Sequence, residues 1–140
     1  MTTEELIYLA GFFDGEGTAT VKRIKNKNYR FGIYFQPIVF ITNTNLEILE
    51  EIKKITGTGI IINLKNLNPH WKSRYNLQIS GQEARAFLKN IFSYLRMKKV
   101  VAEEVCNFPF FNGHYRTEND FNIQELAFNR IKGLNKRGIA

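Results

Sequence analysis

The segment LAGFFDGEG, residues 9–17, constrains this chain more than any other stretch. It reads as the end of an apolar helix, yet it contains three glycines and places two carboxylates, Asp14 and Glu16, where the helix should stop. A glycine inside a helix costs about 1 kcal/mol relative to alanine. A carboxylate at a helix C-terminus meets the negative end of the helix dipole, which is unfavourable by about 0.3–1 kcal/mol. The segment therefore indicates a function that outweighs its local cost in stability.

The helix that leads into this segment is expected to be covered on two sides. Thr2 and Glu5 form a capping box that starts it at Thr3. One helical stripe can cover the core of this chain, and it consists of Leu6, Leu9, Ala10 and Phe13. The second stripe needs a further partner, and it consists of Ile7, Tyr8, Gly11 and Gly15. The glycines one turn apart would let another helix approach closely, although simple tolerance of glycine stays an alternative on spacing alone.

The two acids indicate a divalent cation at the end of this helix. Unpaired carbonyl groups at a helix C-terminus add to the negative field, and oxygen ligands without His or Cys nearby favour Mg²⁺ over zinc. Glu16 is the freer acid, because the small Gly15 and Gly17 beside it allow a phosphate to approach. Asp14 can instead bond backbone groups near the helix end. If two chains pack through this helix, their two Glu16 side chains lie near one two-fold axis and give paired metal sites for two phosphates.

The rest of the pattern predicts an α+β fold with an antiparallel sheet, arranged as one domain over residues 1–140. Strands are expected over residues 18–25, 31–42, 60–65 and 74–80. Pro37 favours a bulge or an edge position in the second strand. Thr44 and Glu47 are expected to cap a helix that runs to about residue 55, and further helices are expected over residues 82–96, 98–108 and 118–134.

Charge and strand patterning together favour a nucleic-acid partner. Lys and Arg outnumber Asp and Glu by 20 to 13, which gives a net charge of +7. One side of the fourth strand is polar throughout, with Arg74, Asn76, Gln78 and Ser80 at alternate positions. Such side chains suit base edges in a major groove. A solvated sheet and a charge that serves solubility are the alternatives.

The cysteine content and the first residues of the chain indicate in which cellular compartment the protein is expected. The single cysteine excludes an internal disulfide, no apolar run reaches the length of a membrane span, and the acidic start MTTEEL is unlike a signal peptide. We expect an intracellular protein. The frequent Ile, Asn, Lys and Phe suggest an AT-rich genome, either in a prokaryotic cytoplasm or in an organelle such as a mitochondrion or chloroplast.

The segment LAGFFDGEG, ending a helix and opening a strand, resembles the signature of the LAGLIDADG homing endonucleases. The resemblance covers nearly the whole chain, with an αββαββα core, a saddle-shaped antiparallel sheet and extra C-terminal helices. Length and layout are similar to the single-motif members, which act as homodimers. The resemblance implies metal-dependent hydrolysis of a long, near-palindromic double-stranded DNA target that leaves short 3′ overhangs. The implied cofactor is Mg²⁺ or Mn²⁺, with Ca²⁺ binding but not supporting cleavage.

The family pattern implies roles for individual residues. Glu16 matches the acidic metal ligand, and Gly15 matches the position whose carbonyl often completes the metal site. Asn43 matches a polar residue that orders active-site water, and Lys98 matches a lysine of the same solvent network. Glu47 departs from the pattern, because some members have a basic residue there. Asn43 could instead help to cap a helix, and Lys98 could instead be a solvated charge or start a helix.

The implied DNA contacts lie on the strands and turns, with a dimer interface on the first helix. The DNA-contacting residues are Thr20, Lys22, Asn26, Lys27, Asn28, Tyr29, Arg30, Tyr34, Gln36, Lys72, Arg74, Asn76 and Gln78. The dimer interface consists of Ile7, Tyr8, Gly11 and Gly15. The alternative functions are an RNA maturase that assists group I intron splicing, a non-catalytic DNA-binding protein on the same fold, or a basic structural protein of a ribonucleoprotein.

Overall fold

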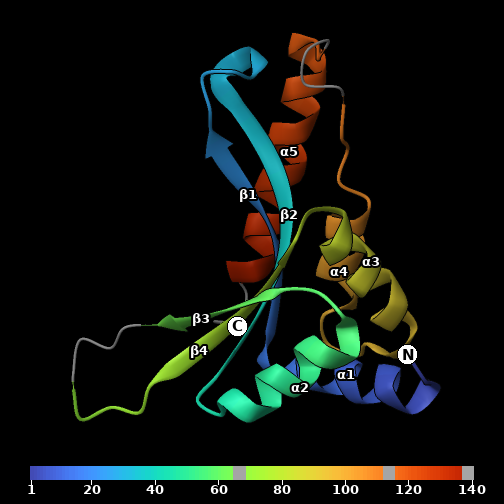
Figure 1. The fold of residues 1–140 in the computed structure, drawn as a ribbon. Coiled ribbons are helices and arrows are strands. Elements are labelled where there is room, and N and C mark those ends of the chain that lie inside the picture. The colour runs from blue at the N-terminus through green and yellow to red at the C-terminus, as the bar shows by residue number, and fades with distance from the viewer. Residues whose placement is uncertain (65–68, 112–115, 137–140) are drawn as a thin grey trace.

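The computed structural model describes residues 1–64, 69–111 and 116–136, and it places a four-stranded antiparallel sheet against a set of helices (Figure 1). The elements in chain order are α1 Thr3–Glu16, β1 Gly17–Lys25, β2 Ile33–Asn43, α2 Leu46–Thr56, β3 Ile60–Leu64, β4 Arg74–Ser80, α3 Gly81–Ile91, α4 Lys99–Cys106 and α5 Glu118–Asn135. This order confirms the expected fold class. The expected strand residue 65 and parts of the expected loops, 66–68 and 112–113, lie outside the described residues. No helix in the described ranges is both long and apolar enough to cross a membrane.

The strands lie in the order β1-β2-β4-β3, so each consecutive pair forms an antiparallel ladder and β2 joins β4. Pro37 pairs with Val21 of β1, and the ladder with β4 starts only at Ile38. At Pro37 the strand therefore has one neighbour, which is the edge position that a residue without an N–H requires.

Every ladder joins residues of equal parity, as in Gly17 with Ile41 and Ile38 with Ser80. Side chains alternate between the two sides of a strand. The even-numbered strand residues therefore share one side of the sheet, the even face, and the odd-numbered residues share the other, the odd face.

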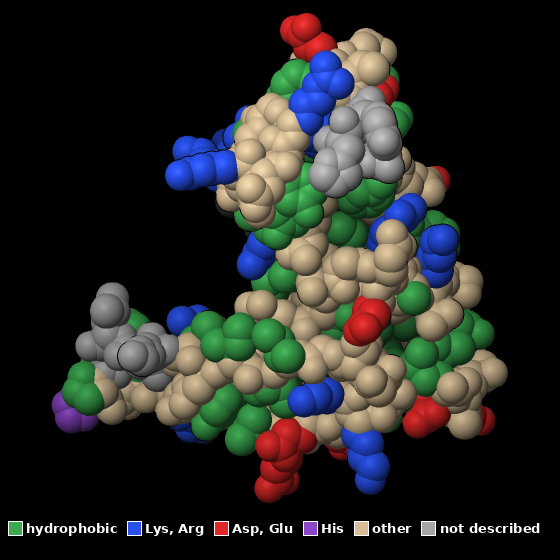
Figure 2. Space-filling view, turned by 45° about the horizontal axis from the view of Figure 1, so that its top comes forward, with side chains coloured by type: hydrophobic (Ala, Val, Ile, Leu, Met, Phe, Trp, Pro, Cys, Tyr) green, Lys and Arg blue, Asp and Glu red, His purple; other side chains and the backbone are tan. Residues whose placement is uncertain are grey.

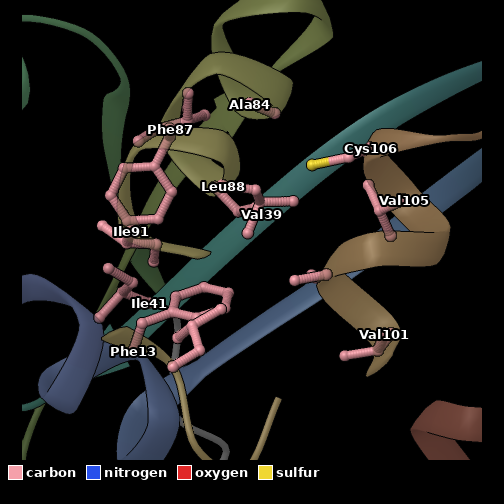
Figure 3. Close-up of a cluster of buried hydrophobic side chains, with 14 of the residues drawn as sticks. Phe13, Val39, Ile41, Ala84, Phe87, Leu88, Ile91, Val101, Val105 and Cys106 are labelled. Atoms are coloured by element: carbon pink, nitrogen blue, oxygen red, sulfur yellow. The ribbon is translucent and has the colours of Figure 1, made fainter. Parts of the chain in front are cut away.

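The odd face carries the helices and the core. Its nearly inaccessible side chains are Ala19, Val21, Phe35, Val39, Ile41, Leu77 and Ile79. Figure 3 shows Phe13 of α1 with residues of α3 and α4 packed around Val39 and Ile41. Phe13 and Phe87 meet edge-on, with ring centroids 5.6 Å apart. The first predicted stripe of α1 is thus the one that covers this chain's own core.

Two expected helix boundaries are wrong in detail. Thr44 with Glu47 does not cap α2; the N-cap is Asn45, whose side chain accepts from the Ile48 N–H at 3.2 Å. Thr and Asn are comparable caps, so capping preference alone does not choose between the adjacent Thr44 and Asn45. The expected helix over 82–96 ends at Ile91 and passes into a 3₁₀ turn over Phe92–Tyr94. The boundary of α1 is confirmed, including the capping box of Thr2 and Glu5.

Candidate functional site

Helix α1 ends abruptly at Glu16, and strand β1 begins with the next residue. A Cβ atom on Gly17 would lie 2.1 Å from the Phe13 ring, so only glycine allows the chain to turn into the strand over that core side chain. Gly15 and Glu16 are both exposed. The last carbonyl groups of α1 and the Glu16 carboxylate therefore share one accessible, oxygen-rich end.

Asp14 points the other way and is 8% exposed. Its Oδ2 accepts from the Arg96 N–H at 2.8 Å, and its Oδ1 accepts from the N–H groups of Met97 and Lys98 at 3.1 and 3.0 Å. Asp14 thus bonds backbone groups near the end of α1, as expected, and these groups belong to the segment that opens α4, for which Lys98 is the N-cap. A carboxylate at a helix N-terminus is favourable, so this contact stabilises both segments.

The Asp14 contact brings Lys98 to the end of α1. Lys98 Nζ donates to the backbone carbonyl of Asp14 at 2.6 Å. Desolvation by burial lowers the pKa of Lys98 from its usual value, while the negative charges of Asp14 and Glu16 act to raise it. The ammonium group thus lies within the electrostatic reach of Glu16, although Lys98 is 82 residues distant in sequence.

Asn43 is the last residue of β2. Because Gly17 pairs with Ile41, Asn43 lies two residues beyond that pair, at the same end of the sheet as Glu16. Its Oδ1 accepts from the Asn45 N–H at 2.8 Å, so it supports the start of α2. Glu47 lies in the exposed first turn of that helix.

The even face carries seven of the proposed DNA-contacting residues. They are Thr20, Lys22, Tyr34, Gln36, Arg74, Asn76 and Gln78. Lys22 Nζ lies 5.6 Å from the centroid of the Phe40 ring on the same face, and Asn76 Nδ2 donates to Thr42 Oγ1 at 2.9 Å. Among the described strand residues of this face none is acidic. Figure 2 shows the molecule hollowed between the β1–β2 hairpin and the β3–β4 arm, with Lys and Arg side chains around the hollow.

The remaining candidates lie on turns. The β1–β2 turn contains Asn26 to Arg30; Asn26 is half-buried and the other four residues are exposed. Asn26 Oδ1 accepts from the Asn28 N–H at 2.9 Å, and Tyr29 stacks on Tyr34 with ring centroids 4.7 Å apart. Lys72 is exposed in the described part of the β3–β4 loop. The β1–β2 turn lies at the end of its ladder opposite Glu16, whereas Lys72 lies beyond Arg74, at the end of β4 that pairs with Asn43.

Comparison with known proteins decides the family. The family model described as LAGLIDADG endonuclease matches residues 9–102, more than half of the chain. This chain belongs to the LAGLIDADG endonuclease family. The family consists of nucleases, generally DNA endonucleases, and some of its members are non-catalytic. No significant match was found among curated protein sequences.

Solved structures share the LAGLIDADG fold with this chain. The homing endonuclease I-CvuI, in complex with its target in the presence of Ca, is 17% identical, with a TM-score of 0.67 over 94% of this chain and 82% of that one. The archaeal intron-encoded homing endonuclease I-Vdi141I, complexed with DNA, is 21% identical, with a TM-score of 0.70 over 93% and 83%. I-LtrWI bound to target DNA is 16% identical, with a TM-score of 0.68, and the match covers 88% of this chain but 42% of that one.

Helix α1, here called the LAGLIDADG helix, supplies few candidate metal ligands. Within residues 1–64, 69–111 and 116–136, no three His, Cys, Asp or Glu side chains are grouped to hold a metal ion. Asp14 is already engaged by three backbone N–H groups, so Glu16 is the acid left to face solvent. With the Gly15 carbonyl, this donor set fits a hard divalent cation, and it is small enough to require further ligands from water, DNA or a second chain.

The second stripe of the LAGLIDADG helix is uncovered in the single chain. Ile7 and Tyr8 are 51% and 43% exposed. A Cβ atom on Gly11 or Gly15 would meet no described atom within 4 Å, apart from its chain neighbours and the adjacent backbone of its own helix. Within this chain, therefore, Gly17 is required by a close contact and the other two glycines are not.

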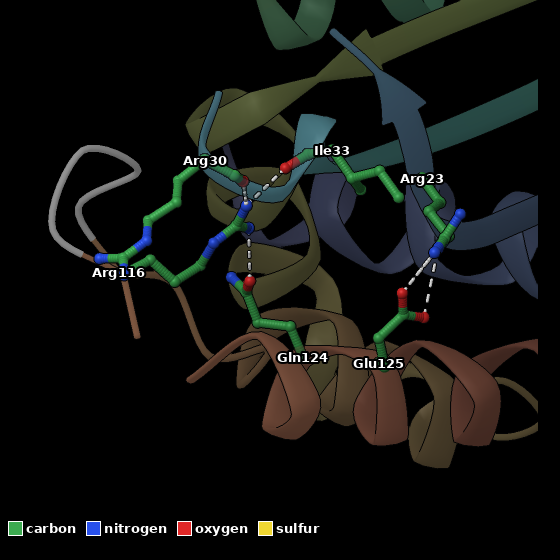
Figure 4. A network of polar contacts seen from close by, with 6 residues as sticks. All are labelled: Arg23, Arg30, Ile33, Arg116, Gln124 and Glu125. Atoms are coloured by element: carbon green, nitrogen blue, oxygen red, sulfur yellow. Dashed lines mark hydrogen bonds and ion pairs between the residues drawn. The ribbon is translucent and has the colours of Figure 1, made fainter. Parts of the chain in front are cut away.

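A residue that sequence reasoning missed holds the tip of the β1–β2 hairpin (Figure 4). Arg116 is 3% exposed; its Nη2 donates to the carbonyls of Arg30 and Ile33 at 2.5 and 2.6 Å, and its Nη1 donates to Gln124 Oε1 at 2.8 Å. Burial lowers the pKa of Arg116 from its usual value, while Asp120 acts to raise it. Between the two carbonyls, Phe31 adopts a positive φ of 68°. No local pattern in the sequence indicates this contact, because it spans 86 residues.

Proposed function

We propose that this chain is a site-specific DNA endonuclease of the homing type, acting as a homodimer on a long, near-palindromic target and leaving short 3′ overhangs. The observation that carries the proposal is the free carboxylate of Glu16, exposed at the end of the LAGLIDADG helix beside Lys98. The proposal includes an intron or intein origin of the gene, which the resemblance to homing endonucleases implies.

Glu16 and the Gly15 carbonyl would hold the divalent cation, Mg²⁺ or Mn²⁺, which when bound neutralises charge on the scissile phosphate and activates water. Ca²⁺ is expected to bind without supporting cleavage. Asp14 fixes the 96–98 backbone and so sets the position of the Lys98 ammonium. Lys98 would stabilise negative charge near the scissile phosphate, and Asn43 would order water at the same end of the sheet.

The homodimer is supported by the uncovered stripe of α1. Two helix glycines with open space around them lower helix stability without serving this chain's own packing. A second α1 laid against Ile7, Tyr8 and the glycines would cover the exposed side chains. It would also bring two Glu16 carboxylates to opposite strands of one duplex. The dimer would carry twice the charge of +7 per chain.

The even face is proposed to lie along the major groove. The absence of acids among its described strand residues removes repulsion from phosphates, and its amide and cationic side chains match base edges and backbone. The turn residues Asn26–Arg30 would reach the outer base pairs of each half-site.

Glu16→Gln tests the reaction. We expect this variant to lose at least 100-fold in cleavage rate on a matched target while its affinity changes less than threefold, because the substitution removes a metal-binding charge and keeps the shape. Glu4→Gln is the matched control, since Glu4 is exposed in the first turn of the same helix and should leave cleavage unchanged. Full activity in Glu16→Gln would refute the mechanism. A group I intron-splicing assay with both variants tests the maturase alternative, which predicts splicing activity without cleavage.

A further inference from the structure

Strand β3 presents a row of aliphatic side chains on the even face. Ile60 and Ile62 are 59% and 37% exposed, and Leu64 at the next even position is partly exposed. β3 is also an edge strand. An exposed apolar row on an edge strand favours unwanted association unless a partner covers it. This row, here called the β3 row, therefore needs an occupant with apolar groups of its own.

The surroundings of the β3 row indicate what that occupant is. Arg74 lies directly beside Leu64, and Lys22 lies across the sheet on the same face. With no acid among the described strand residues of the face, its charge is complementary to a polyanion. The major groove of DNA combines both properties, because phosphates line it and the C5-methyl group of thymine is an apolar patch on its floor.

The pair formed by Ile60 and Gln78 matches one base pair in particular. The two residues are direct cross-strand partners, so their Cβ atoms lie about 4.5–5.5 Å apart. An A·T pair offers adenine N6 and N7 to a glutamine amide and the thymine methyl to an aliphatic side chain, both in the major groove. The next amide along β4, Asn76, differs because it already donates to Thr42 Oγ1 at 2.9 Å.

The spacing of the β3 row matches the spacing of stacked bases. Same-face neighbours on a strand are about 6.6 Å apart, since each residue advances about 3.3 Å. Two base-pair steps are about 6.8 Å, since each step rises about 3.4 Å. When the strand lies along the groove, Ile60 and Ile62 thus face base pairs that are two steps apart.

We infer that β3 reads thymine methyl groups: Ile60 and Gln78 together recognise one A·T pair, and Ile62 contacts a second thymine two base pairs away. The inference rests on the proposed function, because it requires the even face to lie in a major groove. It assigns to β3 a specificity that depends on apolar contact rather than on hydrogen bonds.

Replacing thymine by deoxyuridine tests the inference, because uracil pairs identically and lacks only the methyl group. Tight-binding duplexes are first selected from a randomised pool with the wild-type chain in EDTA, so that nothing is cut. Each thymine of the selected duplex is then replaced singly, and the Kd is measured at one fixed salt concentration. We expect two thymines per half-site, two base pairs apart, to lose about fourfold in affinity each, as loss of one buried methyl predicts, and other thymines to lose less than twofold.

The variant Ile60→Ser assigns the effect to the protein. It should weaken binding to the thymine duplex about fourfold and abolish the penalty of deoxyuridine at one of the two positions, leaving the other penalty intact. Leu126→Ser is the matched control, because Leu126 is an exposed aliphatic residue of α5, outside the sheet, and the substitution should leave both penalties unchanged. Thermal unfolding of each variant checks folding, which an exposed edge side chain should not disturb.

Three outcomes would overturn the inference. Uniform or absent deoxyuridine penalties, or selected G·C pairs at both positions, would exclude methyl recognition while leaving the endonuclease proposal standing. Self-association of the free wild-type chain through β3 that Ile60→Ser abolishes would show that a second copy covers the row. Failure to enrich any duplex would refute the proposed function itself, and with it this inference.

Discussion

Buried groups of opposite charge hold the two ends of the β1–β2 hairpin region, one in α1 just before the hairpin and one against its tip. At the Glu16 end, the Asp14 carboxylate accepts from three backbone N–H groups of residues 96–98. At the tip, the Arg116 guanidinium donates to two backbone carbonyls of the turn. In both places the charge is satisfied mainly by main-chain groups of a segment more than 80 residues away in sequence.

The two ends differ in what the clamp positions. Asp14 fixes the segment that carries Lys98, a group proposed to act on the scissile phosphate. Loss of the Asp14 contacts should therefore lower the cleavage rate. Arg116 fixes a turn whose exposed side chains are proposed to contact outer base pairs. Loss of the Arg116 contacts should therefore reduce discrimination between target sequences. Under the proposed function, the two ends of one hairpin would therefore serve cleavage and base recognition separately.

Asp14→Asn should have the largest effect and tests the clamp at the Glu16 end. An amide offers one acceptor oxygen and turns an NH₂ group toward backbone N–H donors, so we expect the free energy of unfolding to fall by about 3 kcal/mol. Cleavage should fall by about 100-fold, as for groups that orient a reacting site. Denaturant unfolding and single-turnover cleavage measure the two quantities.

Asp120→Asn is the control for that variant, because Asp120 also accepts a backbone N–H, within the capping box of α5. It should lose about 1 kcal/mol or less and cleave normally. Equal cleavage by Asp14→Asn and the wild-type chain would remove the link between this clamp and the chemistry.

Arg116→Met should have the next largest effect and tests the clamp at the tip. Losing the guanidinium leaves buried acceptors without a donor, so the free energy of unfolding should fall by about 2 kcal/mol. Binding should lose discrimination at the outer base pairs, while the cleavage rate at saturating enzyme changes little. Competition with targets altered at outer or at central positions measures this difference, and Arg116→Lys should restore part of it. Loss of discrimination at central positions alone would contradict the comparison.

Gly11→Ala tests whether the Glu16 end, unlike the tip, faces a second chain. Because a Cβ atom there meets open space in the single chain, the helix should gain about 0.5–1 kcal/mol in stability. The same methyl group should weaken the proposed helix–helix contact and lower cleavage. Sedimentation and cleavage of the variant measure both. A variant that is more stable and equally dimeric would exclude close packing at Gly11.

Arg23→Met should have the smallest effect and tests a contact of the hairpin that lies between the two clamps. The Arg23–Glu125 ion pair joins β1 to α5 at 2.5 Å, but its side chains are 35% and 24% exposed. Partly solvated ion pairs contribute about 0–1 kcal/mol, so unfolding should change by less than 1 kcal/mol, with binding and cleavage unaltered. A loss as large as that of Arg116→Met would show that the hairpin is held along its whole length.

Features encoded locally were predictable from the sequence. The capping box at Thr2, the period-two alternation of β4 and the stop at the end of α1 depend on neighbours a few residues apart. Alternation along β3 likewise puts Ile60 and Ile62 on one side of the strand. The run of three isoleucines hides this pattern, because apolar residues stand at both odd and even positions.

Features that depend on distant segments were not predictable. Nothing near Arg116 indicates that it donates to the carbonyls of Arg30 and Ile33, and nothing near Asp14 indicates which N–H groups it accepts from. The choice of Asn45 over Thr44 as the cap of α2 is different, because it involves only the neighbouring Asn43, which accepts from the Asn45 N–H; capping preferences alone do not separate the two residues. Long-range hydrogen bonds leave no periodic trace in a single sequence.

Arg116 donates hydrogen bonds to main-chain oxygens, which every amino acid supplies. Substitutions at positions 27–29 would consequently change the side chains that the turn displays and leave these hydrogen bonds in place. A lineage of such proteins could drift toward new recognition sequences through these positions without first rebuilding the loop. Transferring the turn to a relative would, for the same reason, require the segment that contains Arg116 and Gln124 to be transferred with it.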